Sequence, residues 1–172
     1  MGFSGGGQFA HRFLYLYPER IKAVSIGAPG TVTLLDASID WPRGIKNTQE
    51  LFNRDVNLAE MGRVIGIQLV VGADDVAIHG GEEFWRWLEE TKSKFKLEEK
   101  GDDDQRVVSG GRGENMRVGR LETIRKLKED WNEKGVEARL DIVPAVAHDW
   151  RGVQSTMLDF LGPLIEEQEV KV

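Results

Sequence analysis

The chain has 172 residues, of which 40% are hydrophobic and 30% charged, and its formal net charge is -6. This composition is typical of one soluble globular domain and argues against wholesale disorder. The negative charge argues against a nucleic-acid or anionic-lipid surface, and no apolar stretch reaches the roughly 18 residues of a membrane span. Cysteine is absent, which excludes disulfides and thiolate metal sites. Together with the lack of a visible signal peptide, this slightly favours the cytoplasm; compartment and oligomeric state otherwise stay open.

The first element predicted along the chain is a helix. Phe9, Phe13 and Leu16 recur at helical spacing, which predicts a helix over Gln8–Tyr17 that is covered on most sides. The proline that follows ends this helix. Ala23–Ala28 is a nearly continuous apolar run, as expected of a strand buried on both faces of a parallel sheet.

Residues 29–64 show no steady period and predict an irregular excursion. We expect it to pass over the top of the sheet, as a small cap above a pocket, with a short helix near Thr48–Phe52. A second buried strand follows at Ile65–Val71.

The second half of the chain predicts a helix, a charged insertion, a helix, a strand and a final helix. These elements correspond to residues 81–95, 96–115, 118–134, 136–143 and 153–167. The insertion is rich in glycine and charge, which favours a flexible loop, and its run Asp102–Asp104 is interpreted as solvated rather than metal-binding. Strands that alternate with helices predict one α/β domain over residues 1–172, built on a parallel sheet.

Three motifs with side chains of catalytic types occur in order along the chain. Gly2-Phe3-Ser4-Gly5-Gly6 matches G-x-S-x-G, the pattern of the nucleophile elbow in serine hydrolases. Asp74 and Asp75 follow the second predicted strand, and His148 follows the third. A serine hydroxyl is a weak nucleophile until a histidine removes its proton, and a carboxylate on the other ring nitrogen orients that histidine. The sequence therefore predicts nucleophilic hydrolysis.

The order Ser…Asp…His, together with these motifs, resembles the α/β-hydrolase family. The match covers the C-terminal part of that fold, starting at the elbow, in esterase and polyhydroxyalkanoate-depolymerase-like members. It rests on the segments Gly2–Gly7, Gly72–Asp75 and Val146–Asp149. The resemblance implies a partial α/β-hydrolase, with a parallel sheet flanked by helices and without the N-terminal strands of the family.

The resemblance also implies roles for individual residues. Ser4 becomes the nucleophile, His148 the general base and acid, and the amide of Gly5 one donor of the oxyanion hole. Asp75 is preferred as the triad acid at the end of a G-x-x-D step, but a loop slip of one residue would put Asp74 in its place. The implied reaction is hydrolysis of a small-molecule carboxylic ester or related acyl bond through an acyl-enzyme, with no cofactor.

The sequence also departs from the family pattern. Only three residues precede Ser4, so we expect no feeding strand, a half-built oxyanion hole and an N-terminally incomplete domain. The alternative hypothesis is therefore an inactive truncated hydrolase fragment or an interaction module.

The remaining histidines and the tryptophans are assigned as follows. No role is predicted for His11 and His79. Trp85, Trp87 and Trp131 are expected in the core, while Trp41 and Trp150 are pocket candidates.

Overall fold

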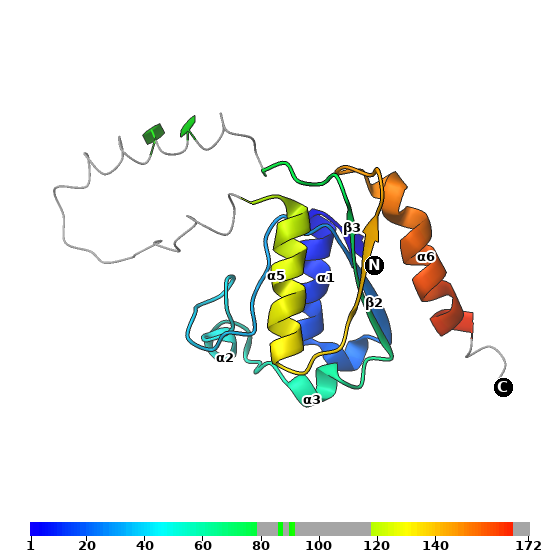
Figure 1. The fold of residues 1–172 in the computed structure, drawn as a ribbon. Helices are drawn as coiled ribbons and strands as arrows, with labels where there is room; N and C mark the ends of the chain where they lie inside the picture. Colours follow the sequence, from blue (N-terminus) through cyan, green and yellow to red (C-terminus); the bar gives the residue numbers. More distant parts are fainter. Residues whose placement is uncertain (79–85, 88–89, 92–117, 167–172) are drawn as a thin grey trace.

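The computed structural model describes residues 1–78, 86–87, 90–91 and 118–166, and its centre is a four-stranded parallel sheet in the order β1-β2-β3-β4 (Figure 1). The elements are β1 (Gly2–Phe3), α1 (Gly5–Leu16), η1 (Pro18–Arg20), β2 (Ala23–Gly27), α2 (Thr48–Phe52), α3 (Leu58–Met61), β3 (Gly66–Gly72), α5 (Arg120–Glu133), β4 (Arg139–Val143) and α6 (Trp150–Glu166). Helices α1 and α5 cover one face of the sheet, and α6 covers the other. The predicted α/β class with a parallel sheet flanked by helices is confirmed.

The short strand β1 corrects one prediction. Gly2 pairs with Ile26 and Phe3 with Gly27, so two residues of parallel strand do lead into Ser4. The amide of Ser4 extends this pairing by donating to the carbonyl of Gly27 at 2.9 Å. A strand of two residues carries no periodic pattern of its own, which is why β1 could not be predicted from the sequence.

The two faces of β3 serve two different layers of the core. Ile67, Leu69 and Val71 pack in the large cluster beneath α1 and α5. The alternate side chains, Gln68 and Val70, point toward α6, as the period of a strand requires. Burial of both faces explains why this strand reads as an almost unbroken apolar run.

One buried polar chain crosses the α6 face of the sheet. The hydroxyl of Ser25 donates to Oε1 of Gln68 at 2.5 Å, and Nε2 of Gln68 donates to Oδ2 of Asp141 at 2.7 Å. Nε2 also donates to the carbonyl of Thr156 in α6 at 3.1 Å. A buried amide is costly unless its groups are bonded, and here partners from two neighbouring strands and a helix satisfy it.

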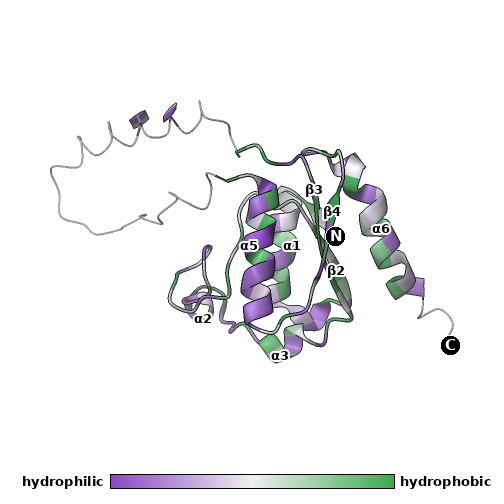
Figure 2. Cartoon of the chain, in the orientation of Figure 1, coloured by the Kyte–Doolittle hydropathy of each residue, from purple (hydrophilic) through white to green (hydrophobic). Residues whose placement is uncertain are grey.

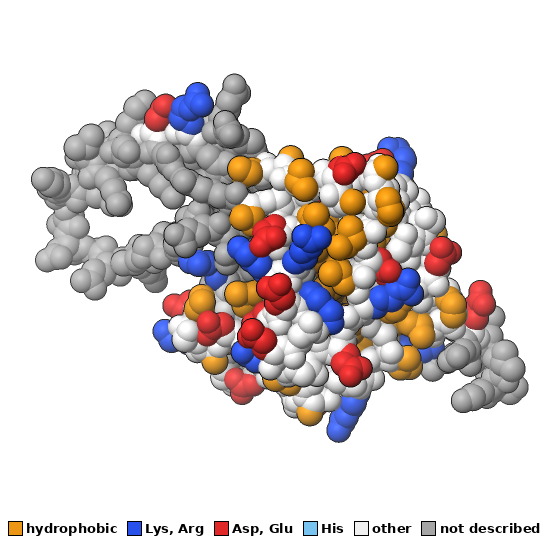
Figure 3. Space-filling view, in the orientation of Figure 1, with side chains coloured by type: hydrophobic (Ala, Val, Ile, Leu, Met, Phe, Trp, Pro, Cys, Tyr) orange, Lys and Arg blue, Asp and Glu red, His pale blue; other side chains and the backbone are white. Residues whose placement is uncertain are grey.

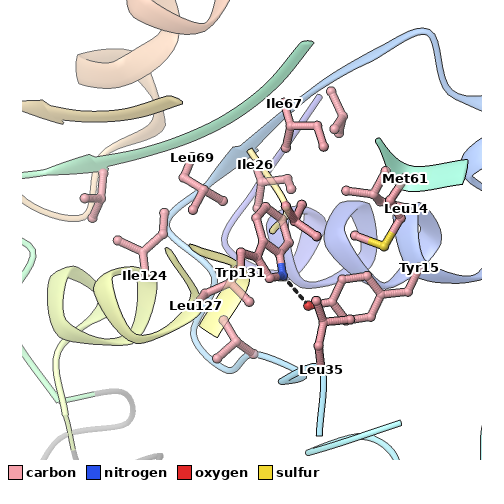
Figure 4. Packing of buried hydrophobic residues seen from close by; sticks show 14 of the residues in the cluster. Leu14, Tyr15, Ile26, Leu35, Met61, Ile67, Leu69, Ile124, Leu127 and Trp131 are labelled. Carbon is pink, nitrogen blue, oxygen red and sulfur yellow. Dashed lines mark hydrogen bonds between the residues drawn. The ribbon is translucent and has the colours of Figure 1, made fainter. Parts of the chain in front are cut away.

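The main core lies between the sheet and helices α1 and α5 (Figure 4). Trp131 is fully buried, as predicted, and its Nε1 donates to the hydroxyl of Tyr15 at 2.6 Å. That hydroxyl donates in turn to the carbonyl of Thr33 at 2.8 Å. Burial raises the pKa of Tyr15, so the phenol stays neutral. Trp87, by contrast, is 57% exposed, and the expectation that it belongs to the core is wrong.

The buried face of α1 differs in part from the predicted one. Phe9 is 67% exposed, and it stacks on Phe13 at a centroid distance of 5.5 Å along the outer side of the helix. The buried face contains His11, Leu14, Tyr15 and Leu16, so Leu16 of the predicted stripe is buried as expected. Phe9 and Phe13 have helical spacing, but Phe9 lies on the exposed side of α1, whereas Phe13 is half-buried.

The excursion over residues 29–64 packs along the helices. Val32 and Leu35 are buried in the core, and the amide of Leu35 donates to Oδ2 of Asp130 in α5 at 2.7 Å. Helix α2 has the predicted bounds, whereas α3, a single turn that contacts η1, was not predicted. A covering role of this segment over Ser4 stays a prediction.

The surface in view carries acidic and basic side chains interspersed over α5, beside a strip of hydrophobic ones that lies between α5 and α6 (Figure 3). Figure 2 shows that both hydrophilic and hydrophobic residues occur along α5. In the part of the chain that the structure describes, no helix has the length and apolar character needed to cross a membrane. The predicted insertion at 96–115 and most of the predicted helix at 81–95 lie outside the described residues.

Candidate active site

Ser4, Asp75 and His148 lie at one edge of the sheet because each follows the carboxyl end of a parallel strand. Ser4 comes directly after β1, Asp75 three residues after the end of β3, and His148 five residues after the end of β4. The carboxyl ends of parallel strands are where open α/β sheets gather their ligand-binding groups.

The three predicted side chains form one hydrogen-bonded chain. Nε2 of His148 lies 3.1 Å from Oγ of Ser4, and Nδ1 lies 2.7 Å from Oδ2 of Asp75. The side chain of Asp75 is 1% exposed and that of His148 is 31% exposed, so the chain runs from the interior to the surface. Asp74 is exposed, and its amide donates to the carbonyl of Val146 at 2.9 Å. Asp75, and not Asp74, therefore contacts the imidazole.

Ser4 occupies a strained turn between β1 and α1. Its dihedral angles are φ 55° and ψ -115°, and it is the N-cap residue of α1. A positive φ is uncommon for a residue with a Cβ atom, and such strain tends to occur at functional sites. The turn brings Oγ out of the sheet at the point where His148 reaches it.

Two glycines allow α1 to approach the sheet closely. A Cβ atom on Gly2 would overlap the backbone carbonyl of Gly6, and one on Gly7 would overlap the carbonyl of Gly27. Nothing lies within 4 Å of a Cβ built on Gly5 or Gly6. The amide of Gly5 is the first of α1, and the first amides of a helix have no acceptor within the helix.

His148 is held by a neighbouring ring and by the loop that carries it. The ring of Phe3 stacks on the imidazole, with centroids 4.8 Å apart and an interplanar angle of 27°. The loop is fixed to the segment after β3, because the amide of Ala73 donates to the carbonyl of Val143 at 2.8 Å. Gly72 lies so close to Val146 that a Cβ there would overlap its carbonyl. Phe3 was not predicted as a site residue; its only sequence signal is its place next to Ser4.

Arg120 is a second neighbour that sequence reasoning missed. Its Nη1 lies 3.4 Å from Oδ1 of Asp75, the carboxylate oxygen that His148 does not contact. Arg120 is the first residue of α5 and is 8% exposed. Nothing in the local sequence marks it, because the two partners are 45 positions apart.

A small apolar hollow lies beside the site. It measures about 200 Å³ and is lined by Met1, Gly2, Phe3, Trp150, Gln154 and Met157. Trp150 is 47% exposed and lies two residues after His148. Trp41, the other predicted pocket residue, packs edge-on against Phe52 instead. A larger hollow of about 430 Å³ is found at the opposite ends of the strands, near Gly66 and Arg139, and is remote from this chemistry.

His11 is buried in the first turns of α1. Its Nδ1 lies 3.1 Å from the carbonyl of Gly7, and its Nε2 accepts from the amide of Thr33 at 3.0 Å. Burial lowers the pKa of His11 to about 3, more than the hydrogen bond to Gly7 raises it. This neutral ring joins α1 to the segment after β2 and has no contact with Ser4 among its hydrogen bonds. His79 lies outside the described residues.

No protein-family model and no curated protein matches this chain. Among solved structures, poly(aspartic acid) hydrolase-1 from Sphingomonas sp. KT-1 is similar, with a TM-score of 0.57 and 19% sequence identity. The alignment covers 94% of this chain and 53% of that one, so the chain spans about half the length of this structural neighbour. At this identity the likeness establishes an α/β fold that a hydrolase shares.

Proposed function

We propose that the protein is a serine hydrolase of the α/β-hydrolase type, acting on carboxylic esters or related acyl bonds. Ser4 is the nucleophile, His148 the general base and acid, and Asp75 the carboxylate that orients the imidazole. The observation that carries the proposal is the continuous chain of contacts, 3.1 Å from Ser4 to His148 and 2.7 Å from His148 to Asp75. These distances are within hydrogen-bond reach, which proton transfer between the groups requires.

The first half of the reaction forms an acyl-enzyme. Oγ of Ser4 attacks the substrate carbonyl carbon while Nε2 of His148 takes the hydroxyl proton. The negative charge that develops on the carbonyl oxygen is stabilised by the amide of Gly5 at the N-terminus of α1. The alcohol then leaves with the proton from His148, and an ester of Ser4 remains.

The second half releases the acid. Water gives a proton to Nε2 of His148 and attacks the acyl carbon. The bond between this carbon and Oγ then breaks, His148 returns the proton to Oγ of Ser4, and a carboxylic acid is released. Asp75 stays ionised throughout and stabilises the imidazolium at Nδ1. No step needs a metal or an organic cofactor.

Hydrolysis of p-nitrophenyl esters by the full chain tests this proposal. We expect turnover that is lost on S4A and on H148Q, with both variants folded. Turnover that is equal in S4A and in the unsubstituted protein contradicts the assignment. Because the structural neighbour is named as a poly(aspartic acid) hydrolase, poly(aspartic acid) belongs in the same substrate panel.

A second candidate function is that of a non-catalytic interaction module. The observation in its favour is that β1, the strand that precedes Ser4, has only two residues and lies at the edge of the described sheet. The same assay separates the two candidates, since clear Ser4-dependent turnover refutes the module.

A further inference from the structure

The carboxylate of Asp75 contacts two different side chains with its two oxygens. Oδ2 lies 2.7 Å from Nδ1 of His148, and Oδ1 lies 3.4 Å from Nη1 of Arg120. The Arg120 side chain is 10% exposed and that of Asp75 is 1% exposed, so water has little access to the pair. A buried charge is strongly destabilising without a partner, which explains why a guanidinium and a carboxylate meet here.

Backbone contacts fix the start of α5 against the segment that carries Asp75. The amide of Leu121 donates to the carbonyl of Asp75 at 3.0 Å. Gly119 approaches the backbone of Val76 so closely that a Cβ atom at this position would overlap it. The position of Arg120 relative to Asp75 is therefore set by the main chain on both sides, and the side chain needs only to extend from a fixed point.

We propose that Arg120 is a positioning residue that holds the Asp75 carboxylate in the orientation that directs Oδ2 at His148. The torsion that turns a carboxylate about its Cβ–Cγ bond has broad minima, so one contact to an imidazole leaves it loosely defined. A second contact on Oδ1 fixes the plane of the carboxylate. Arg120 acts through Asp75 and does not touch the substrate. Its catalytic consequence rests on the proposed function.

The kinetic test compares R120M with R120K. We expect R120M to lower kcat about 10- to 100-fold, the range for a misplaced catalytic group, while KM changes less than about twofold. R120K restores most of kcat because it keeps a cation near Oδ1. Arg139 gives the matched control: it pairs with Asp141 through a side chain that is 60% exposed, and R139M keeps the kcat of the unsubstituted protein.

A double variant separates positioning from general stability. In a D75N background, R120M should change kcat less than about twofold, because no carboxylate is left to orient. A merely structural Arg120 would lower the melting temperature in both backgrounds without separating kcat from KM, and that pattern overturns the proposal. R120Q replaces R120M if the latter does not fold; its shorter neutral side chain should also lower kcat.

Proton NMR provides a readout that needs no activity. The proton between Nδ1 of His148 and Asp75 should give a downfield resonance, assigned by its loss in H148Q. We expect this resonance in the unsubstituted protein and in R120K, and its loss or displacement in R120M. If Ser4-dependent turnover is absent, the proposed function fails and the resonance alone decides. An unchanged resonance in folded R120M then overturns the positioning role of Arg120.

Discussion

Nδ1 of His148 lies 2.7 Å from Oδ2 of Asp75, although 73 positions of the chain separate the two residues. The contact unites the loops after β3 and β4, and it leaves Nε2 free to face Ser4 at 3.1 Å. Because the Asp75 side chain is buried and the imidazole is part-exposed, the carboxylate is shielded from water while the other ring nitrogen is open to a substrate. The first prediction follows from this relationship.

Replacing Asp75 with asparagine should reduce kcat about 1,000- to 10,000-fold. The amide presents either a donor or a weaker acceptor to Nδ1, so the imidazole adopts the wrong tautomer for taking the Ser4 proton. D74N is the matched control, because Asp74 is exposed and has no contact with the imidazole among the contacts described. Steady-state ester hydrolysis measures both variants, and an equal loss in D74N would show that the acid has been misassigned.

Two glycines at the start of α1 should respond oppositely to alanine. G7A is expected to destabilise the protein by about 1–3 kcal/mol, because its Cβ would overlap the carbonyl of Gly27 and overpacking forces the backbone to shift. G6A has open space, and alanine restricts the unfolded chain, so its free energy of unfolding should stay the same or rise by up to about 1 kcal/mol. Urea unfolding measures the free energy of unfolding of both variants. Equal destabilisation of G6A and G7A would contradict the close approach of Gly7 to Gly27.

The hydroxyl of Tyr15 is predicted to stabilise the core. Y15F should cost about 1–3 kcal/mol, because the indole N–H of Trp131 and the carbonyl of Thr33 both lose their partner in a buried place. Y17F, on a half-buried ring near the end of the same helix region, provides the control and should change stability by less than about 0.5 kcal/mol. Thermal or urea unfolding measures the stability of both variants. Similar losses of stability in Y15F and Y17F would contradict a stabilising role of the buried hydrogen bonds of Tyr15.

His11 should make stability fall with decreasing pH. Burial lowers its pKa from 6.5 to about 3, with a smaller contribution in the same direction from the charge of Arg12, while the hydrogen bond to Gly7 opposes the shift. Below pH 6.5 the unfolded chain binds a proton at this histidine that the folded protein excludes. The contribution of His11 is therefore fully present above pH 6.5 and decreases toward pH 3, at about 1.4 kcal/mol per pH unit.

The variant H11Q isolates this effect. Glutamine does not titrate, so the free energy of unfolding of H11Q should fall less steeply between pH 6.5 and pH 4 than that of the unsubstituted protein. The two slopes should differ by up to about 1.4 kcal/mol per pH unit, which corresponds to one proton. The comparison uses slopes, which any constant destabilisation by the substitution leaves unaffected. Parallel slopes would show that His11 titrates alike in the folded and unfolded chains.

The elements that the sequence predicted are those with a strong local pattern. β2 and β3 read as apolar runs because both of their faces are buried, and α2 has the expected bounds. The misses have local causes too. β1 is too short to carry a period, and α3 is a single turn. The face of α1 was misjudged because the aromatic stripe through Phe9 and Phe13 has the same helical period as the face that the sheet covers.

The candidate site also contains both residues that the sequence predicted and residues that it missed. The G-x-S-x-G motif marks Ser4, and Asp75 and His148 each follow a predicted strand, so the sequence alone could predict all three as site residues. The choice of Asp75 over Asp74 needed the structure, since it depends on which carboxylate turns inward after β3. Arg120 and Phe3 were missed because their contacts with the site follow from tertiary packing, which no short motif encodes.

Labelling with a fluorophosphonate probe tests the central claim most directly, because such a probe phosphonylates an activated serine and needs no knowledge of the substrate. The account predicts that one phosphonyl group is added to the intact chain, that peptide mapping locates it on Ser4, and that S4A and H148Q abolish the labelling. Labelling that persists in S4A, or that maps to another residue, would contradict the assignment of Ser4 as the nucleophile.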